Sequence, residues 1–410
     1  MPEAIIDGSS LTIDWLKQRV FEAFPLPLKD GLKMEEPQLK SWSSCKIGEN
    51  KGFVSFIVKV SFEWANNCQD VLPKSIVVKL PTVEKLKDIS KDMMGDKKHF
   101  FENLIPDIHK KEVNFYQSWM NATEAPPIKI PRCYFGQEIT TEKPGVLLLE
   151  DLSQLGAQQT VGHGLTLPQA LQIAEELASL HAWCLKHSGQ WEQKFPGWDR
   201  KLFANWEQTT KAIFDECRKE FCPQHFDLDL VNKFETQAMS LDESFWYSLT
   251  VHEEFNMPPV LVHGDLWVGN MMFKAVPGSD PYKKEPSDEL LVIYDWQTCF
   301  PGCAVFDFVR LATLSMSTEM RRKQVKPVIL KRYHDSLTEK LGKEPPYSLE
   351  AMEKAFDRLL PVGFHRAFAF FVHVGGSMKE QTFGGNEYKE EILRRGRDLM
   401  EDTAKLLKYI

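Results

Sequence analysis

The stretch VLVHGDLWVGNMMF at residues 260–273 decides the fold, because it joins a buried strand to a polar loop. Its first three residues are apolar and are typical of a strand inside a sheet. Asp265 follows the strand, and Asn270 lies five residues later. A carboxylate at a strand end can accept a proton from a hydroxyl group, and an amide oxygen can bind a metal ion. We therefore interpret Asp265 as a candidate catalytic base and Asn270 as a candidate metal ligand.

A second segment, LLVIYDWQ at residues 290–297, places Asp295 at the end of another apolar strand. A carboxylate in this position is costly to bury unless it meets a cation or hydrogen-bond donors. Phosphoryl transfer supplies such a cation, since Mg²⁺ neutralises phosphate oxygens and prefers carboxylate ligands. Asp295 is therefore a second candidate Mg²⁺ ligand, and the alternative is that it caps the turn that follows.

The N-terminal part of the chain contains features expected of a nucleotide site. Lys79 lies in the apolar strand IVVKLP, where its ammonium group needs an anionic partner. Glu112, on a helix 33 residues later, is the natural partner, and Glu102 is the second choice. A solvent-facing lysine is the alternative.

Gly48 and Gly52 link two strands and would let the backbone approach phosphates, although glycines are common in hairpins for steric reasons alone.

The pattern of apolar residues divides the chain near Asp151. The first part favours a small antiparallel sheet, with strands at 53–64, 75–80 and 145–150, and a helix at 97–120 that breaks at Pro106. The second part is mostly helical, with a capping box at 166–169 and a surface loop at 276–289. We predict an α+β fold in two lobes: residues 1–150 form a nucleotide-binding lobe, and residues 151–410 form a catalytic and substrate-binding lobe.

Composition excludes several classes of function. The net charge of −8 disfavours nucleic acid as a partner. The short basic clusters at 97–98, 110–111, 321–323 and 394–395 are interpreted as solvated helix faces. The N-terminus does not resemble a signal peptide, and no apolar run reaches the length that spans a membrane, so we expect a cytoplasmic protein. The 8 cysteines form no metal-binding or disulfide pattern.

The order of these features, from glycine loop to strand aspartate, is that of a protein-kinase-like fold. The motifs HGDLWVGN and YDWQ resemble the choline kinase and aminoglycoside phosphotransferase superfamily. Within it, LLLEDL at 147–152, LASLHA at 177–182 and the Trp of HGDLW resemble the ecdysteroid kinase-like (CHK kinase-like) family, over about residues 40–400.

The resemblance implies a role for each matching residue. Asp265 would be the catalytic base, Asn270 and Asp295 the Mg²⁺ ligands, and Lys79 the ATP phosphate anchor held by Glu112. The strand at 146–151, with Glu150, would be the hinge that offers backbone groups to adenine. Asp307 is taken as structural, and His263 as a residue that fixes the loop by hydrogen bonding.

The expected activity is ATP- and Mg²⁺-dependent transfer of phosphate to a small-molecule hydroxyl acceptor that is steroid-, glycoside- or choline-like. A protein kinase is disfavoured, because Gly264 replaces the Arg of its catalytic loop and no long activation segment follows. A kinase-fold protein that binds ligands without turnover is the other alternative. The aromatic face of Phe364, Phe368 and Phe371 is either core or acceptor pocket, and the oligomeric state is left open.

Overall fold

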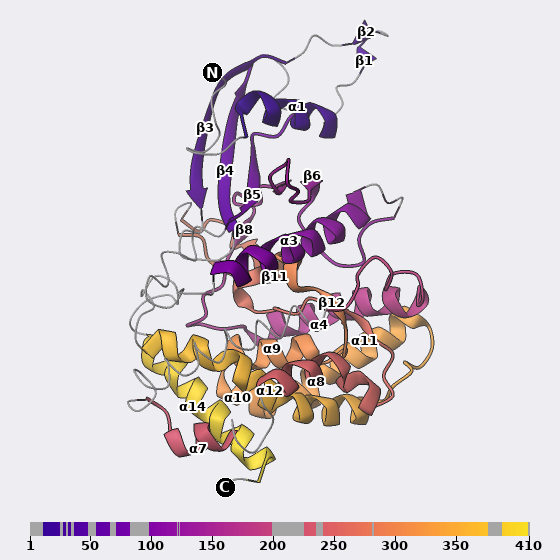
Figure 1. Cartoon of the computed structure of the whole chain (residues 1–410), viewed down its shortest axis with the longest axis vertical. Helices are drawn as coiled ribbons and strands as arrows, with labels where there is room; N and C mark the ends of the chain where they lie inside the picture. The colour runs from indigo at the N-terminus through magenta and orange to yellow at the C-terminus, as the bar shows by residue number, and fades with distance from the viewer. Residues whose placement is uncertain are drawn as a thin grey trace. The chain divides into compact units, whose positions relative to one another are not determined.

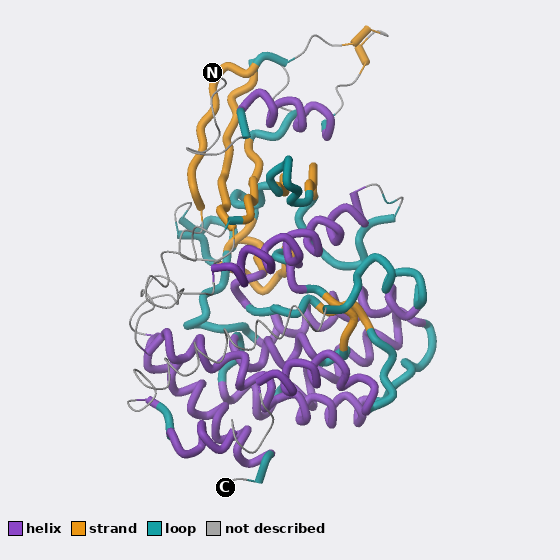
Figure 2. The backbone as a smooth tube through the Cα atoms, viewed as in Figure 1, coloured by secondary structure: helices purple, strands orange, loops and turns teal. Residues whose placement is uncertain are grey.

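The computed structural model describes most of the chain, in thirteen segments. They are residues 11–24, 28–29, 32–33, 37–47, 55–65, 71–82, 98–120, 122, 124–198, 225–234, 241–280, 283–375 and 388–408. The chain forms two compact units (Figures 1 and 2). Unit 1 is Met1–Ala125 with Pro131–Gln154, and unit 2 is Pro126–Ile130 with Leu155–Ile410.

Unit 1 is built on a five-stranded antiparallel sheet. Its strands, in sheet order, are β3 (Leu39–Ile47), β4 (Ser55–Trp64), β5 (Ser75–Pro81), β7 (Val146–Glu150) and β6 (Cys133–Gln137). A separate pair joins β1 (Leu28–Lys29) to β2 (Leu32–Lys33). The apolar and buried residues 146–149 of β7 lie between two neighbouring strands, as expected for a strand inside a sheet. The strands predicted at 53–64, 75–80 and 145–150 are thereby confirmed over 55–64, 75–80 and 146–150, while residues 53 and 54 lie outside the described residues.

Two of the described helices belong to the same unit as this sheet. Helix α1 (Ile13–Ala23) begins at Thr12, whose hydroxyl accepts a hydrogen bond from the Trp15 N–H, and its Leu16 and Val20 enter the core of β4 and β5. Helix α3 (Lys98–Met120) contains Pro106 in its interior and continues through it. The predicted break there was wrong. Buried residues on both sides of the proline, including Leu104 and Val113, hold the helix together despite the lost hydrogen bond.

Unit 2 is mainly helical, and two small sheets carry its functional loops. One sheet has the order β11 (Pro286–Ile293), β10 (Met271–Ala275) and β8 (Gly156–Ala157); the other pairs β12 (Phe300–Gly302) with β9 (Val260–Val262). The loop predicted at 276–289 ends earlier than expected, because β11 begins at Pro286 and pairs there with Ala275. Pairing with β10 extends β11 toward its N-terminus, and the local sequence does not reveal this partner.

The helices of unit 2 form the bulk of its core. They are α4 (Leu167–Lys186), α7 (Leu228–Lys233), α8 (Leu241–Glu254), α9 (Phe306–Leu314), α10 (Thr318–Lys323), α11 (Lys331–Leu341), α12 (Leu349–Gly375) and α14 (Lys389–Leu406), with a π-helical turn at Val325–Leu330. Helix α4 begins with the predicted capping box, in which the Thr166 hydroxyl and the Gln169 side chain cap one another's backbone N–H groups. None of the described helices is both long enough and apolar enough to cross a bilayer.

The aromatic face of α12 belongs to the core. Phe364, Phe368 and Phe371 are each at most 1% exposed. The Phe368 ring packs against Phe226 at a centroid distance of 5.4 Å, and the Phe364 ring packs against Phe234 at 5.1 Å. This settles the alternative that the sequence left open, since side chains packed in this way do not line an acceptor pocket.

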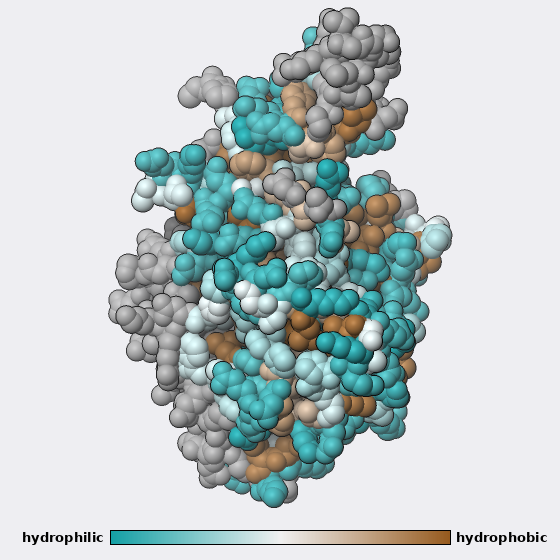
Figure 3. All heavy atoms as spheres, turned by 90° about the vertical axis from the view of Figure 1, so that its right-hand side faces the viewer, coloured by the Kyte–Doolittle hydropathy of each residue, from teal (hydrophilic) through white to brown (hydrophobic). Residues whose placement is uncertain are grey.

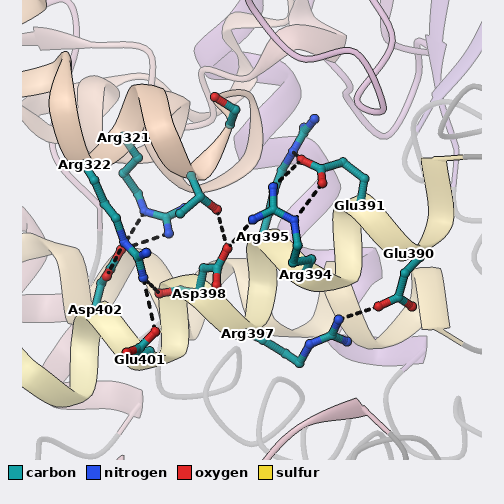
Figure 4. A network of polar contacts seen from close by, with 12 residues as sticks. Arg321, Arg322, Glu390, Glu391, Arg394, Arg395, Arg397, Asp398, Glu401 and Asp402 are labelled. Carbon is teal, nitrogen blue, oxygen red and sulfur yellow. Dashed lines mark hydrogen bonds and ion pairs between the residues drawn. The ribbon is translucent and has the colours of Figure 1, made fainter.

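Two of the basic residues expected at the surface are instead buried. Arg321 and Arg395 are each 5% exposed, and Figure 4 shows them within a polar network between α10 and α14. Arg321 donates to Asp402, while Arg395 donates to the carbonyl oxygens of Val161 and Gly162. The interpretation of these clusters as solvated was therefore wrong for these two side chains, because carboxylate and carbonyl oxygens accept most of their N–H groups; Arg321 Nη1 is buried without a hydrogen-bond partner among the described residues.

The surface carries few large apolar side chains. On the face shown in Figure 3, hydrophobic residues form separate groups among hydrophilic ones. Of the described residues, the large hydrophobic ones that are exposed are Val71, Met120, Leu155, Val276 and Leu406. They come from different elements, as expected for isolated surface residues.

Candidate active site

The loop after β9 turns sharply at Gly264, which has a φ of +83°. A Cβ atom at this position would lie 2.4 Å from the Thr298 carbonyl oxygen, so both the conformation and the space require glycine. The Thr298 hydroxyl donates to the His263 carbonyl oxygen at 3.0 Å. The turn therefore packs the loop after β9 against the segment after β11, and it aims Asp265 out of the strand.

Asp307, at the start of α9, holds the backbone of this loop. Its carboxylate accepts hydrogen bonds from the N–H groups of His263 at 2.7 Å and Gly264 at 3.0 Å, and the residue is fully buried. Burial raises the pKa of Asp307, while His263 and these two N–H groups act in the opposite direction. Since it touches only the backbone of the loop, Asp307 acts as a structural residue.

The His263 side chain connects the two loops. Its Nε2 lies 2.9 Å from the Tyr294 carbonyl oxygen, immediately before Asp295, and its ring packs on Trp296 with centroids 4.7 Å apart. Because a carbonyl oxygen only accepts, Nε2 is the donor in this contact. The geometry is that of a residue that fixes the loop.

Asn270 lies beside Asp265. Its side-chain nitrogen donates to the Asp265 backbone oxygen at 2.9 Å and lies 3.4 Å from carboxylate oxygen Oδ2. Because the amide nitrogen faces Asp265, the amide oxygen points the other way. Asn270 is 6% exposed and ends a short 3₁₀ turn, Val268–Asn270, so this orientation is fixed.

Asp295 follows β11 in a left-handed conformation, with φ 68° and ψ 53°. This backbone region is sparsely populated and costs of order 1 kcal/mol for a residue with a Cβ, although Asp tolerates it better than most. The Asp295 carboxylate makes no capping hydrogen bond to the turn Trp296–Thr298 that follows. The backbone cap that the sequence left as an alternative is therefore absent, and Asp295 Oδ2 instead accepts a hydrogen bond from the Gln297 side-chain amide at 3.4 Å.

Backbone hydrogen bonds bring the segments of Asn270 and Asp295 together. The Tyr294 N–H donates to the Asn270 carbonyl oxygen at 3.0 Å, and Met271 pairs with Ile293 across β10 and β11. An amide oxygen and a carboxylate from adjacent strand ends are hard oxygen donors of the kind that Mg²⁺ binds. In the described part of the chain, no three His, Cys, Asp or Glu side chains gather as a metal site, so the fit to Mg²⁺ rests on this mixed amide and carboxylate pair.

Two arginines that the sequence analysis missed also contact this loop. Arg310 of α9 donates from Nε to Asp265 Oδ1 at 2.9 Å, and its Nη2 lies 2.8 Å from the same oxygen as an ion pair. Arg366 of α12 donates to the Gly264 carbonyl oxygen at 3.3 Å. The only sequence signal was a charged residue one turn after Asp307 in an otherwise apolar helix.

Lys79 and Glu112 lie together in unit 1. Lys79 Nζ is 2.6 Å from Glu112 Oε2, and the two side chains are 8% and 1% exposed. Their neighbour His109 is also buried; burial lowers the pKa of His109 to about 4, and the Lys79 charge adds to this, against a hydrogen bond to the Gln137 carbonyl. Lys79 is therefore paired inside the unit, and the solvent-facing alternative is excluded. The side chain of Glu102 lies outside the described residues.

The end of β7 is held by hydrogen bonds to neighbouring residues. The Glu150 N–H donates to the Arg132 carbonyl oxygen at 2.8 Å, and the Glu150 carboxylate accepts from the Arg132 N–H at 3.2 Å. Burial raises the pKa of Asp151, but hydrogen bonds from Lys59, Ser75 and Ser153 outweigh it and lower this pKa to about 2. The N–H of Glu150 is thus occupied within the sheet. Gly48 and Gly52 lie outside the described residues.

Comparisons with known proteins agree with this fold. A family model described as "DUF1679: Uncharacterized oxidoreductase dhs-27" matches residues 36–409. The chain is 26% identical over 365 residues to the Caenorhabditis elegans protein "Uncharacterized oxidoreductase dhs-27", covering 86% of this chain but only 41% of that protein. It is 21% identical over 299 residues to the "Uncharacterized kinase-like protein D1044.1" of the same organism, covering 70% of this chain and 71% of that one.

Among solved structures, a choline kinase from Cryptosporidium parvum Iowa II superposes with a TM-score of 0.50. The two sequences are 12% identical, and the match covers 97% of this chain and 96% of the other. The likeness shows a kinase-like fold and confirms the predicted α+β class, with an antiparallel sheet followed by helices. Together with the model that matches residues 36–409, these findings show that the chain belongs to the DUF1679 family.

Proposed function

We propose that this chain is a small-molecule kinase that uses ATP and Mg²⁺ to phosphorylate a hydroxyl group. The observation that carries the proposal is the assembly of Asp265, Asn270 and the Asp295 segment in one loop cluster of unit 2. A candidate base and oxygen donors for a divalent ion are what phosphoryl transfer requires of a protein. The kinase-like fold supports the same conclusion.

Each residue has a distinct task in the proposed reaction. Asp265 orients the acceptor hydroxyl and takes its proton as the oxygen attacks. Asn270 and Asp295 hold Mg²⁺, which when bound neutralises charge on the phosphate oxygens. Lys79, fixed by Glu112, binds phosphate oxygens of the nucleotide, and the segment after Glu150 offers backbone groups to adenine. Gly48 and Gly52, which lie outside the described residues, are assigned to phosphate binding on their sequence spacing alone.

The acceptor is proposed to be a small molecule that is steroid-, glycoside- or choline-like, on the resemblance to ecdysteroid kinase-like proteins. Incubation of the chain with Mg·ATP and a metabolite extract, followed by mass spectrometry, is expected to reveal a species that gains one phosphate. Asp265→Asn should lower kcat for this product by roughly 10²–10⁴, as expected for loss of a general base, while ATP still binds.

Asp229→Asn provides the matched control, since Asp229 is an exposed carboxylate at the start of α7. It should leave the rate unchanged. Equal rates for wild type and Asp265→Asn would refute the proposed base. Binding of ATP without any phosphorylated product would favour a kinase-fold protein that binds ligands without turnover.

A further inference from the structure

The side chain of Arg310 meets the candidate base in a defined geometry. Its Nε donates to oxygen Oδ1 of Asp265 at 2.9 Å, and its Nη2 forms an ion pair with the same oxygen at 2.8 Å. The two side chains are 16% and 29% exposed, so the pair is partly shielded from water. Within the described segments, the other oxygen, Oδ2, is approached by the Asn270 amide nitrogen at 3.4 Å. The pair therefore makes the two carboxylate oxygens inequivalent.

Arg310 is itself held in place by α12. Its Nη1 donates to the Arg366 carbonyl oxygen at 3.3 Å. The Arg366 guanidinium lies 5.1 Å from the centre of the Phe306 ring and donates to the Gly264 carbonyl oxygen. Burial and the Arg310 charge lower the pKa of Arg366 to about 10, so it stays cationic at neutral pH. Two helices thus contact the loop at 263–265. Arg310 of α9 binds the Asp265 carboxylate, and Arg366 of α12 binds the Gly264 backbone oxygen.

There is little free space around these arginines. A cavity lined in part by Arg310 and Arg366 has about 10 Å³, room for a single water molecule. Gly363 of α12 faces Val309 of α9 so closely that a Cβ would lie 2.5 Å from the Val309 Cγ1 atom. The helices are in close contact here, and the Arg310 side chain has a restricted set of positions.

From this geometry we propose that Arg310 is a positioning residue for Asp265, an inference that rests on the proposed function. By occupying Oδ1, Arg310 fixes the carboxylate so that Oδ2 is the oxygen presented to the acceptor hydroxyl. The planar fork of a guanidinium fixes orientation as well as charge, which an ammonium group does not. A displacement of about 1 Å at a catalytic group can lower a rate about 100-fold, so orientation at this point matters.

The test compares Arg310→Gln and Arg310→Lys in the full chain, with phosphate release from Mg·ATP to water as the assay. Arg310→Gln is expected to lower kcat about 10- to 100-fold while the Kd for Mg·ATP changes less than about twofold. Arg310→Lys should be intermediate, because it restores charge but not the fork.

A double-mutant cycle separates positioning from a general structural effect. If Arg310 acts through Asp265, then Arg310→Gln should have no further effect on kcat in the Asp265→Asn background. Additive losses in kcat, or a rise in the Kd for Mg·ATP that parallels the fall in rate, would overturn the inference. An Arg310→Gln rate equal to wild type would do the same.

The outcomes also distinguish the inference from the function on which it rests. If Asp265→Asn leaves phosphate release unchanged, Asp265 is not the catalytic base and the proposed function fails. If Asp265→Asn lowers the rate and Arg310→Gln does not, only the positioning role of Arg310 fails. Should Arg310→Gln not fold, the Arg310→Lys variant alone decides, through a lowered kcat at an unchanged Kd.

Discussion

Lys79 Nζ lies 2.6 Å from Glu112 Oε2, with both side chains almost completely withdrawn from solvent. Their strand and helix belong to the same unit, and 33 residues separate them in the chain. A buried ion pair of this kind contributes little net stability, but removal of one partner leaves an uncompensated charge. The pair therefore fixes the ammonium group in one position, as a phosphate anchor needs.

Glu112→Gln should destabilise the protein by about 3–5 kcal/mol, since the Lys79 ammonium would remain buried without its counter-charge. Urea denaturation measures this change. The double variant Lys79→Met with Glu112→Gln should recover a large part of the loss. As a control, Glu289→Gln removes an exposed partner of Lys274 and should leave the denaturation midpoint nearly unchanged. Additive losses in the double variant would contradict a coupled pair.

Asp295→Asn should weaken the Mg²⁺-dependent part of ATP binding by about tenfold, or 1.4 kcal/mol. Asparagine tolerates the left-handed backbone of this position, so the variant removes charge without adding strain. Titration of ATP with and without Mg²⁺ measures the effect. The affinity without Mg²⁺ should be retained. An affinity for Mg·ATP equal to that of wild type would exclude Asp295 as a ligand.

His365 makes the protein less stable in acid. It is 5% exposed, and burial lowers its pKa to about 4, from an ordinary value of 6.5. Between these two pH values the unfolded state binds more protons, so stability is lost as pH falls from 6.5 toward 4. His365→Phe, which suits the neighbouring rings of Phe234 and Phe364, should reduce the stability lost between pH 7 and pH 5 by roughly 1–2 kcal/mol. Urea midpoints at both pH values provide the test, and parallel profiles for the two proteins would contradict it.

Arg395 secures α14 to the loop before α4. Arg395→Met would leave the carbonyl oxygens of Val161 and Gly162 without their donors, at a cost of about 1–3 kcal/mol each. Arg322→Met is the matched control in the same network, because Arg322 is 40% exposed and its ion pairs should contribute less than about 1 kcal/mol (Figure 4). Thermal unfolding should show a much lower Tm for Arg395→Met than for Arg322→Met. Equal Tm shifts for the two variants would contradict the expectation that the buried arginine contributes more stability than the exposed one.

Local pattern was enough to predict much of this molecule. The apolar run before His263, the capping box at Thr166 and the buried strand that ends at Glu150 all occur where the residues indicate. Each depends on neighbours within a few positions, through strand alternation, helix periodicity and turn chemistry. Where a distant partner intervened, the predictions failed: helix α3 continues through Pro106, and β11 begins at Pro286.

The sequence by itself determined which residues are available for chemistry, because HGDLWVGN and YDWQ specify their own strand ends and turns. Only the tertiary structure decided what surrounds them. Arg310 reaches Asp265 from 45 positions away, and Arg366 reaches Gly264 from 102 positions away. Such contacts depend on how helices pack, and no local propensity encodes that packing. For the same reason, burial of Arg321 and Arg395 could not be inferred from a run of charged residues.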